Sequence, residues 1–126
     1  MNKDKPELEI KDKHLTAPRI TPEHVESIIN SVNYFTGREG VLGAYKSNND
    51  IYQGDSPNAI SNEALSCITF CVIILDNGYT VVGQSACTSP SNYNKELGES
   101  IALSKAKDKV FELEGYLLKC KLGEIV

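Results

Sequence analysis

The stretch that decides the fold is residues 65–87, which read LSCITFCVIILDNGYTVVGQSAC. Residues 65–75 are apolar or β-branched at nearly every position, which is typical of a strand covered on both faces. The dipeptide Asn77-Gly78 follows, and it is the strongest short-range signal for a hairpin turn because both residues tolerate a positive φ. Residues 79–87 form a second β-rich run. We therefore predict a hairpin at the centre of a small antiparallel sheet.

A helical signal precedes this hairpin. Thr21 is expected to cap a helix whose first position is Pro22. Apolar residues recur at helical spacing to about residue 34, and Gly37 is expected to end the helix. A short strand is possible over residues 41–45. The apolar stripe consists of Val25, Ile28, Ile29 and Val32.

Residues 46–62 are rich in Asn, Asp, Ser, Gly and Pro and show no periodicity, which predicts a long loop that is either functional or mobile. After the hairpin, Ser89-Pro90 repeats the pattern of a cap followed by proline and predicts the start of a C-terminal helix. Gly115 is expected to break or bend it, which gives one long helix or two shorter ones. Because helices flank the sheet instead of alternating with strands, we predict an α+β fold.

Length and charge narrow the function classes. The 126 residues suit a single domain, expected over residues 20–122 after a charged, disordered tail at 1–19. The formal net charge of −4 disfavours binding to duplex nucleic acid, and no apolar run is long enough to span a membrane. The charged start carries no secretory signal, so we expect a cytosolic protein.

The cytosolic setting predicts that the cysteines are thiols. Their spacing fits no zinc or redox motif, and two of them lie in the apolar run, where a free cysteine acts as a small hydrophobe. We therefore expect buried structural thiols, no metal and no cofactor. The four cysteines are Cys67, Cys71, Cys87 and Cys120.

Catalysis is not expected. Residues 83–87, GQSAC, approach the nucleophile motif G-x-S-x-G, but Cys87 stands where the second glycine belongs. The only histidine outside the tail that could act as a base for Ser85 is His24. A hydrolase that uses these two residues is the least favoured reading.

Residues 85–93 are more informative, because they gather hydroxyls, an amide and an aromatic ring where a helix is expected to begin. A helix N-terminus attracts anions, Tyr93 could stack on a base, and Asn92 could bond the edge of that base. Ordinary helix capping, with Tyr93 in the core, is the alternative. Lys109 directly precedes Val110-Phe111, which should face the core.

A set of motifs spans much of the chain: residues 65–72, 77–87, 89–94, 97–98 and 109–111, with Ala102, Ala106, Gly115, Tyr116, Leu118 and residues 34–36. These residues closely resemble a small phage protein family, the phage N4 gene 49 / Sf6 gene 66 product family, over about residues 20–122. The resemblance implies a phage or prophage protein that acts in the bacterial cytoplasm. Most members carry Glu where this chain has Gln84, and Trp where it has Phe111.

The chain's size and its order of helix, sheet and helix are also similar to Thoeris anti-defence proteins of the first type. Those phage proteins bind immune signals of the cyclic ADP-ribose type, and in some cases cyclic oligonucleotides, without cleaving them. This similarity implies a non-enzymatic sponge for cyclic nucleotides. We expect a homodimer or higher homo-oligomer, with the pocket at a subunit interface.

The expected ligand-binding residues include base-recognition, ribose and phosphate contacts. They are Val82, Gln84, Ser85, Ser89, Asn92, Tyr93, Lys109 and, more weakly, Arg38. The main alternative is a protein-interaction module that blocks a host protein through its acidic surface and the 46–62 loop.

Overall fold

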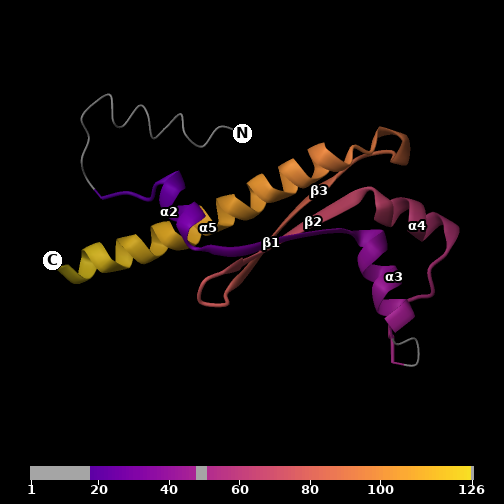
Figure 1. The fold of residues 1–126 in the computed structure, drawn as a ribbon, viewed down its shortest axis with the longest axis horizontal. Helices are drawn as coiled ribbons and strands as arrows, with labels where there is room; N and C mark the ends of the chain where they lie inside the picture. Colours follow the sequence, from indigo (N-terminus) through magenta and orange to yellow (C-terminus); the bar gives the residue numbers. More distant parts are fainter. Residues whose placement is uncertain (1–17, 48–50, 126) are drawn as a thin grey trace.

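The computed structural model describes residues 18–47 and 51–125 (Figure 1). Three strands form one antiparallel sheet in the order β1-β2-β3, so the predicted α+β class is confirmed. No described helix is both long and apolar enough to cross a membrane. The elements are α2 (Pro22–Ser27), β1 (Ile29–Thr36), α3 (Gly37–Ser47), α4 (Ala59–Ser66), β2 (Ile68–Leu75), β3 (Thr80–Ala86), the 3-10 helix η1 (Pro90–Asn92) and α5 (Lys95–Ile125).

The predicted hairpin is confirmed. Gly78 has φ 87°, and the amide of Leu75 donates to the Tyr79 carbonyl at 2.8 Å, which closes the turn between β2 and β3. Of the two hairpin strands only β2 is central in the sheet, because β1 pairs with the edge of β2 that faces away from β3. Burial alternates along β2, so this strand buries one face fully and the other partly, where both faces were expected to be covered.

The core lies between α5 and one face of the sheet (Figure 1). Gly83 on β3 allows the close approach, because a Cβ at this position would overlap the backbone of Ala102 and Ala106 on α5. The facing residues of α5, Ala102 and Ala106, also have short side chains, so the helix and the strand pack closely. The buried residues of the core are Val25, Cys71, Ile73, Leu75, Val81, Ala102, Ala106 and Val110.

The other face of the sheet is largely open. Side chains alternate between the two faces of a strand, so the partners Phe35–Phe70 and Val72–Val82 point away from α5. The two phenylalanine rings stack with centroids 5.3 Å apart. Helix α3 packs near the Phe35 end of this face, where Gly40 lies close to the Phe35 ring.

The first predicted helix is only partly correct. The Thr21 hydroxyl accepts a hydrogen bond from the His24 amide at 3.1 Å, and Pro22 is the first helical residue, as expected. However, the helix ends at Ser27, and residues 29–36 form β1. Pairing with β2 along this whole run outweighs the helical spacing of its apolar residues, because tertiary contacts override weak local propensity.

The predictions for residues 37–62 are wrong in their main elements. Gly37 begins α3 instead of ending a helix, and the possible strand at 41–45 lies inside α3. Thr36 and Glu39 form a capping box that starts this helix, with hydrogen bonds of 2.8 and 3.1 Å. The expected loop is shorter, because α4 begins at Ala59 behind a second capping box; residues 48–50 lie outside the described residues.

The C-terminal helix is a single element. α5 begins at Lys95 behind Asn94, whose side chain accepts from the Leu97 amide at 3.1 Å, while Ser89 makes no capping hydrogen bond and precedes only the short η1. Gly115 does not break the helix. The prediction of a tail at residues 1–19 falls mainly on residues 1–17, which lie outside the described residues.

The cysteines are free thiols, and two of them, Cys67 and Cys71, are buried as expected. Burial raises the pKa of the Cys71 thiol, so it stays protonated and acts as an apolar side chain. Cys87 is half-buried and Cys120 is exposed.

We predict that Gly83→Ala lowers the free energy of unfolding by about 2 kcal/mol or more, because overpacking here pushes the backbone of α5 away from β3. Gly43→Ala on α3 is the control, since a Cβ there meets nothing within 4 Å. That change should raise stability by up to about 1 kcal/mol through helix propensity. Urea unfolding followed by circular dichroism measures both, and a stable Gly83→Ala variant would contradict the packing described.

Candidate functional site

A groove of about 340 Å³ lies at the end of the sheet where β1 finishes and α5 begins. Residues from β1, α3, α4, β2, η1 and α5 line it, so the chain builds it from segments that are far apart in the sequence. Its size is at the small end of the range for ligand pockets. The lining side chains are Phe35, Thr36, Arg38, Glu39, Ser66, Thr69, Pro90, Tyr93, Lys95 and Glu99.

Thr69 is the most unusual side chain of this groove. It is only 2% exposed, and its hydroxyl oxygen has no hydrogen-bond partner among the described residues. It lies beneath α5, where a Cβ on Gly98 would be 3.0 Å from this oxygen. A buried hydroxyl without a partner costs about 1–3 kcal/mol.

Two cations lie at the rim of the groove, each at the beginning of a helix. Arg38 is in the first turn of α3, and Lys95 is the first residue of α5. Because a helix N-terminus carries a partial positive charge, the two cations and the two helix ends favour an anionic group. Tyr93 adds a half-buried aromatic ring from the segment between η1 and α5.

Two carboxylates balance these cations. Hydrogen bonds from the Thr36 amide and hydroxyl hold the pKa of Glu39 below its usual value, with a smaller contribution from Lys95. The Glu39 carboxylate therefore stays charged and is already engaged in its capping box. Glu99 lines the groove as well. The arrangement suits a ligand with one or two anionic groups and several hydrogen-bond donors, not a long polyphosphate.

The structure brings two of the sequence-predicted residues, Arg38 and Tyr93, into this groove. Ser85 is buried beside it, where its hydroxyl donates to the Gly98 carbonyl at 2.7 Å and holds α5 against β3. Ser89 bonds to the Ser91 hydroxyl at 2.9 Å, and Asn92 is exposed on η1. The predicted residues therefore do not form one cluster. Ser85 lies in the contact between α5 and β3, Ser89 and Asn92 lie on a surface turn, and Arg38 and Tyr93 line the groove.

The remaining predicted residues lie elsewhere. Gln84 and Val82 point to the open face of the sheet, away from α5. The Lys109 ammonium donates to the Val82 carbonyl at the free edge of β3. This contact covers part of an unpaired strand edge, which is a common protection against unwanted pairing. A second groove, of about 600 Å³, runs beside it between β3 and α5.

The structure does not bring together Ser85 and His24, the pair required by the least favoured reading, a hydrolase. Ser85 contacts Gly98 near the start of α5, whereas His24 pairs with Glu114 at 2.6 Å. These two helix positions are about 24 Å apart along the axis for a rise of 1.5 Å per residue. Within residues 18–47 and 51–125, no group of three or more potential ligands could hold a metal ion.

Sequence reasoning missed Thr69, Lys95 and Glu99. Thr69 carries a faint signal, since its hydroxyl interrupts an otherwise apolar strand. No motif or pattern in the sequence sets Lys95 and Glu99 apart from the other charged residues of the C-terminal segment. Their relevance depends on the end of β1 and on α3, which the sequence pattern did not place.

One protein family matches most of this chain. The family described as phage protein (N4 Gp49/phage Sf6 gene 66) matches residues 20–122, which is most of the chain. The chain belongs to this family. The family resemblance of the sequence motifs is thereby confirmed, and the N4 Gp49/Sf6 gene 66 description identifies a phage protein. Searches of curated proteins and of solved structures found no match.

We predict that Ser85→Ala lowers the free energy of unfolding by about 1 kcal/mol, because it removes the buried hydrogen bond to Gly98. Ser89→Ala is the control, because its hydroxyl bonds only at the surface and should change stability by less than about 0.5 kcal/mol. Chemical denaturation of both variants provides the measurement. Equal effects of the two changes would contradict the structural role of Ser85.

Proposed function

We propose that this phage protein binds and sequesters a small cyclic nucleotide signal in the groove at the start of α5, without cleaving it. The observation that carries the proposal is the buried hydroxyl of Thr69, which lacks a partner within the described chain and lines a groove that also holds Tyr93 and Arg38. Cyclic ADP-ribose-type molecules and cyclic oligonucleotides are the signals to which this chemistry is suited.

Each lining residue has a role in this proposal. The Tyr93 ring stacks on a base, and the Arg38 guanidinium forms paired hydrogen bonds to a phosphate. Lys95 adds a point charge at the helix end. The Glu99 carboxylate accepts hydrogen bonds from ribose hydroxyls or a base amino group, and Thr69 bonds a buried polar atom of the ligand.

Sequestration without turnover is supported by the positions of the nucleophile and base candidates. Ser85 donates its hydrogen bond to a backbone carbonyl, and His24 is engaged by Glu114 at a distant point of α5. A phage protein that removes a host immune signal by tight binding needs no catalytic group, only a site that excludes water from its polar contacts. We place this activity in the cytoplasm of the bacterial host.

Calorimetric titration with a panel of cyclic nucleotides tests the proposal. Loaded protein is then denatured by heat, and the released ligand is analysed by mass spectrometry. Binding of a panel member with release of the intact molecule supports sequestration. Release of an altered molecule identifies an enzyme, and absence of binding across the panel contradicts a nucleotide site.

We predict that Thr69→Val weakens binding of such a ligand about tenfold, which corresponds to one lost hydrogen bond. The same change keeps the side-chain shape and removes an unpartnered hydroxyl, so stability should be unchanged or rise by about 1 kcal/mol. Thr80→Val is the matched control, because Thr80 is exposed on the other face of the sheet. A marked loss of stability in Thr69→Val would show that the hydroxyl serves the fold instead.

A second candidate function is binding to a host protein through the open face of the sheet. The specific observation is the row of apolar side chains opposite α5, in which Phe35 and Val82 remain 37% and 38% exposed. Val82→Asp would abolish such an interaction while leaving nucleotide binding intact, which separates the two functions in one variant.

A further inference from the structure

Two cysteines lie opposite each other where the pairing of β2 with β3 ends. Ile68 and Ala86 are the last partners in the register, so Cys67 and Cys87 are the next residues across. The Cys87 amide donates to the Cys67 carbonyl at 3.0 Å, which extends the ladder by one step. A hydrogen-bonded antiparallel pair has its Cα atoms about 5.5 Å apart, and disulfides most often join Cα atoms about 5.5–6 Å apart. The backbone therefore already holds this thiol pair, Cys67 and Cys87, at the spacing of a disulfide.

The two thiols also point to the same side of the sheet. Residues directly opposite in a sheet share a face, and the thiol pair continues the row of Thr69 and Ser85, which lies beneath Gly98 of α5. Burial and then a hydrogen bond to the Cys87 side chain raise the pKa of the Cys67 thiol. The two sulfur atoms are thus neighbours as well as the two backbones.

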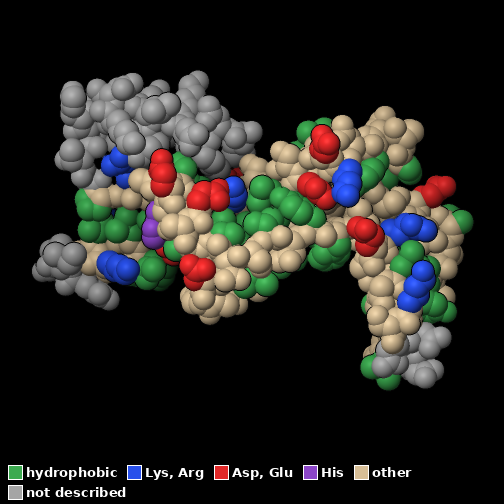
Figure 2. Space-filling view, viewed as in Figure 1, with side chains coloured by type: hydrophobic (Ala, Val, Ile, Leu, Met, Phe, Trp, Pro, Cys, Tyr) green, Lys and Arg blue, Asp and Glu red, His purple; other side chains and the backbone are tan. Residues whose placement is uncertain are grey.

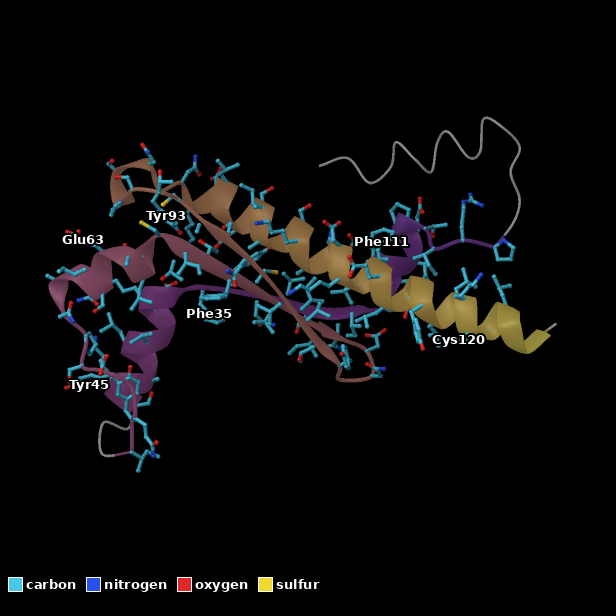
Figure 3. The ribbon with its side chains drawn as sticks, turned by 180° about the vertical axis from the view of Figure 1, so that it is seen from behind. Phe35, Tyr45, Glu63, Tyr93, Phe111 and Cys120 are labelled. Atoms are coloured by element: carbon cyan, nitrogen blue, oxygen red, sulfur yellow. The ribbon has the colours of Figure 1, made fainter. Side chains whose placement is uncertain are left out.

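The other two cysteines lie too far away to compete within one chain. Cys71 is opposite Gly83, four residues along the ladder, which is about 14 Å and well beyond the limit of about 7 Å between bridged Cα atoms. Figure 3 shows Cys120 near the C-terminal end of α5, whereas Tyr93, which lines a cavity with the thiol pair, lies beyond the other end of that helix.

This cavity, of about 70 Å³, limits what can reach the sulfur atoms. A small molecule such as water or hydrogen peroxide fits, because a buried water needs only about 15 Å³ of such space. Larger organic molecules occupy pockets of about 300 Å³ or more. Figure 2 shows acidic and basic side chains mixed at the end of the molecule where α5 begins, so no charge of a single sign selects an ionic reagent. A small neutral oxidant suits this site.

We propose that Cys67 and Cys87 form a reversible disulfide when the protein meets hydrogen peroxide. Cys87 is half-buried and Cys67 is 9% exposed, so the Cys87 sulfur reacts first. It attacks one peroxide oxygen, the O–O bond breaks, and the second oxygen leaves as water, which makes Cys87 a sulfenic acid. The Cys67 sulfur then attacks the Cys87 sulfur; the S–S bond forms, the S–O bond breaks, and the hydroxyl leaves with the Cys67 proton as a second water. The two electrons lost by the two thiols thus reduce one peroxide to two waters.

The disulfide joins the start of β2 to the segment that leads into η1. Cytosolic thiols return it to the reduced state by thiol–disulfide exchange. A nucleotide takes no part in these steps, so the disulfide forms whether or not the groove binds one. Failure of the disulfide and failure of nucleotide binding are therefore separate results.

Peptide mapping after treatment with hydrogen peroxide tests the proposal. The parent protein is Cys120→Ser, because the exposed Cys120 thiol could otherwise pair between chains. Chymotrypsin cuts after Phe70 and after Tyr79, which places each of the three remaining cysteines on its own peptide. Most chains should lose the mass of two hydrogen atoms and yield the Cys67 peptide linked to the Cys87 peptide. Dithiothreitol should separate the two peptides again.

Two variants of this parent test the order of the steps. In Cys67→Ala the Cys87 sulfenic acid has no thiol to attack it, so its labelling by dimedone should rise about tenfold over the parent. Cys87→Ser is the matched control and should give neither the linked peptide nor the label. Circular dichroism checks that both variants are folded.

Three outcomes would overturn the proposal. The first is a parent whose Cys67 and Cys87 both stay free thiols, and the second is a link that involves Cys71. The third is a parent in which Cys87 accumulates as sulfenic acid to the same extent as in Cys67→Ala, because Cys67 would then not react with it.

Discussion

The close contact between the backbone of α5 and Gly83 is the constraint on which the other features depend. With no side chain on Gly83 and only methyl groups on Ala102 and Ala106, the helix lies directly on β3. The Ser85 hydroxyl then sets the position of α5 along its axis through the Gly98 carbonyl. Thr69 lies beneath Gly98, where its hydroxyl has no hydrogen-bond partner among the described residues. The candidate binding feature is thus a consequence of tight packing.

The same contact explains why the two ends of α5 differ. The helix is 31 residues long, while the strands beneath it have only seven or eight residues. A strand of eight residues spans about 26 Å, and a helix of this length spans about 46 Å, so one cannot cover the other. Because Ser85 anchors α5 close to its beginning, the excess length extends from the C-terminal end. The groove therefore forms at the anchored end, and at the free end Leu113 and Leu117 remain 39% and 43% exposed.

Local signals made part of this fold predictable from sequence. The hairpin follows from Asn77-Gly78, and the first helix begins at the expected cap, since both depend on a few neighbouring residues. β1 was not predictable in this way, because its apolar residues also fit a helix and only pairing with β2 decides between the two. The pattern of Thr36 followed by Glu39 is a sequence signal for a capping box at the start of α3. It was not used, because Gly37 between them was expected to end a helix. The groove draws on six elements, so only its Arg38 and Tyr93 could be foreseen.

Net charge is a poor guide to the site, because electrostatic binding depends on charges within a few ångströms of the ligand. The chain carries a formal charge of −4, yet the groove combines Arg38 and Lys95 with two helix N-termini. One of its two carboxylates, Glu39, is engaged by Thr36, which leaves Glu99 to meet a ligand. A long anionic backbone needs a concentrated positive surface, which a net charge of −4 disfavours, whereas a small anion needs only the few charges that line the groove. The acidic composition thus argues against a nucleic-acid coat and is compatible with a nucleotide pocket.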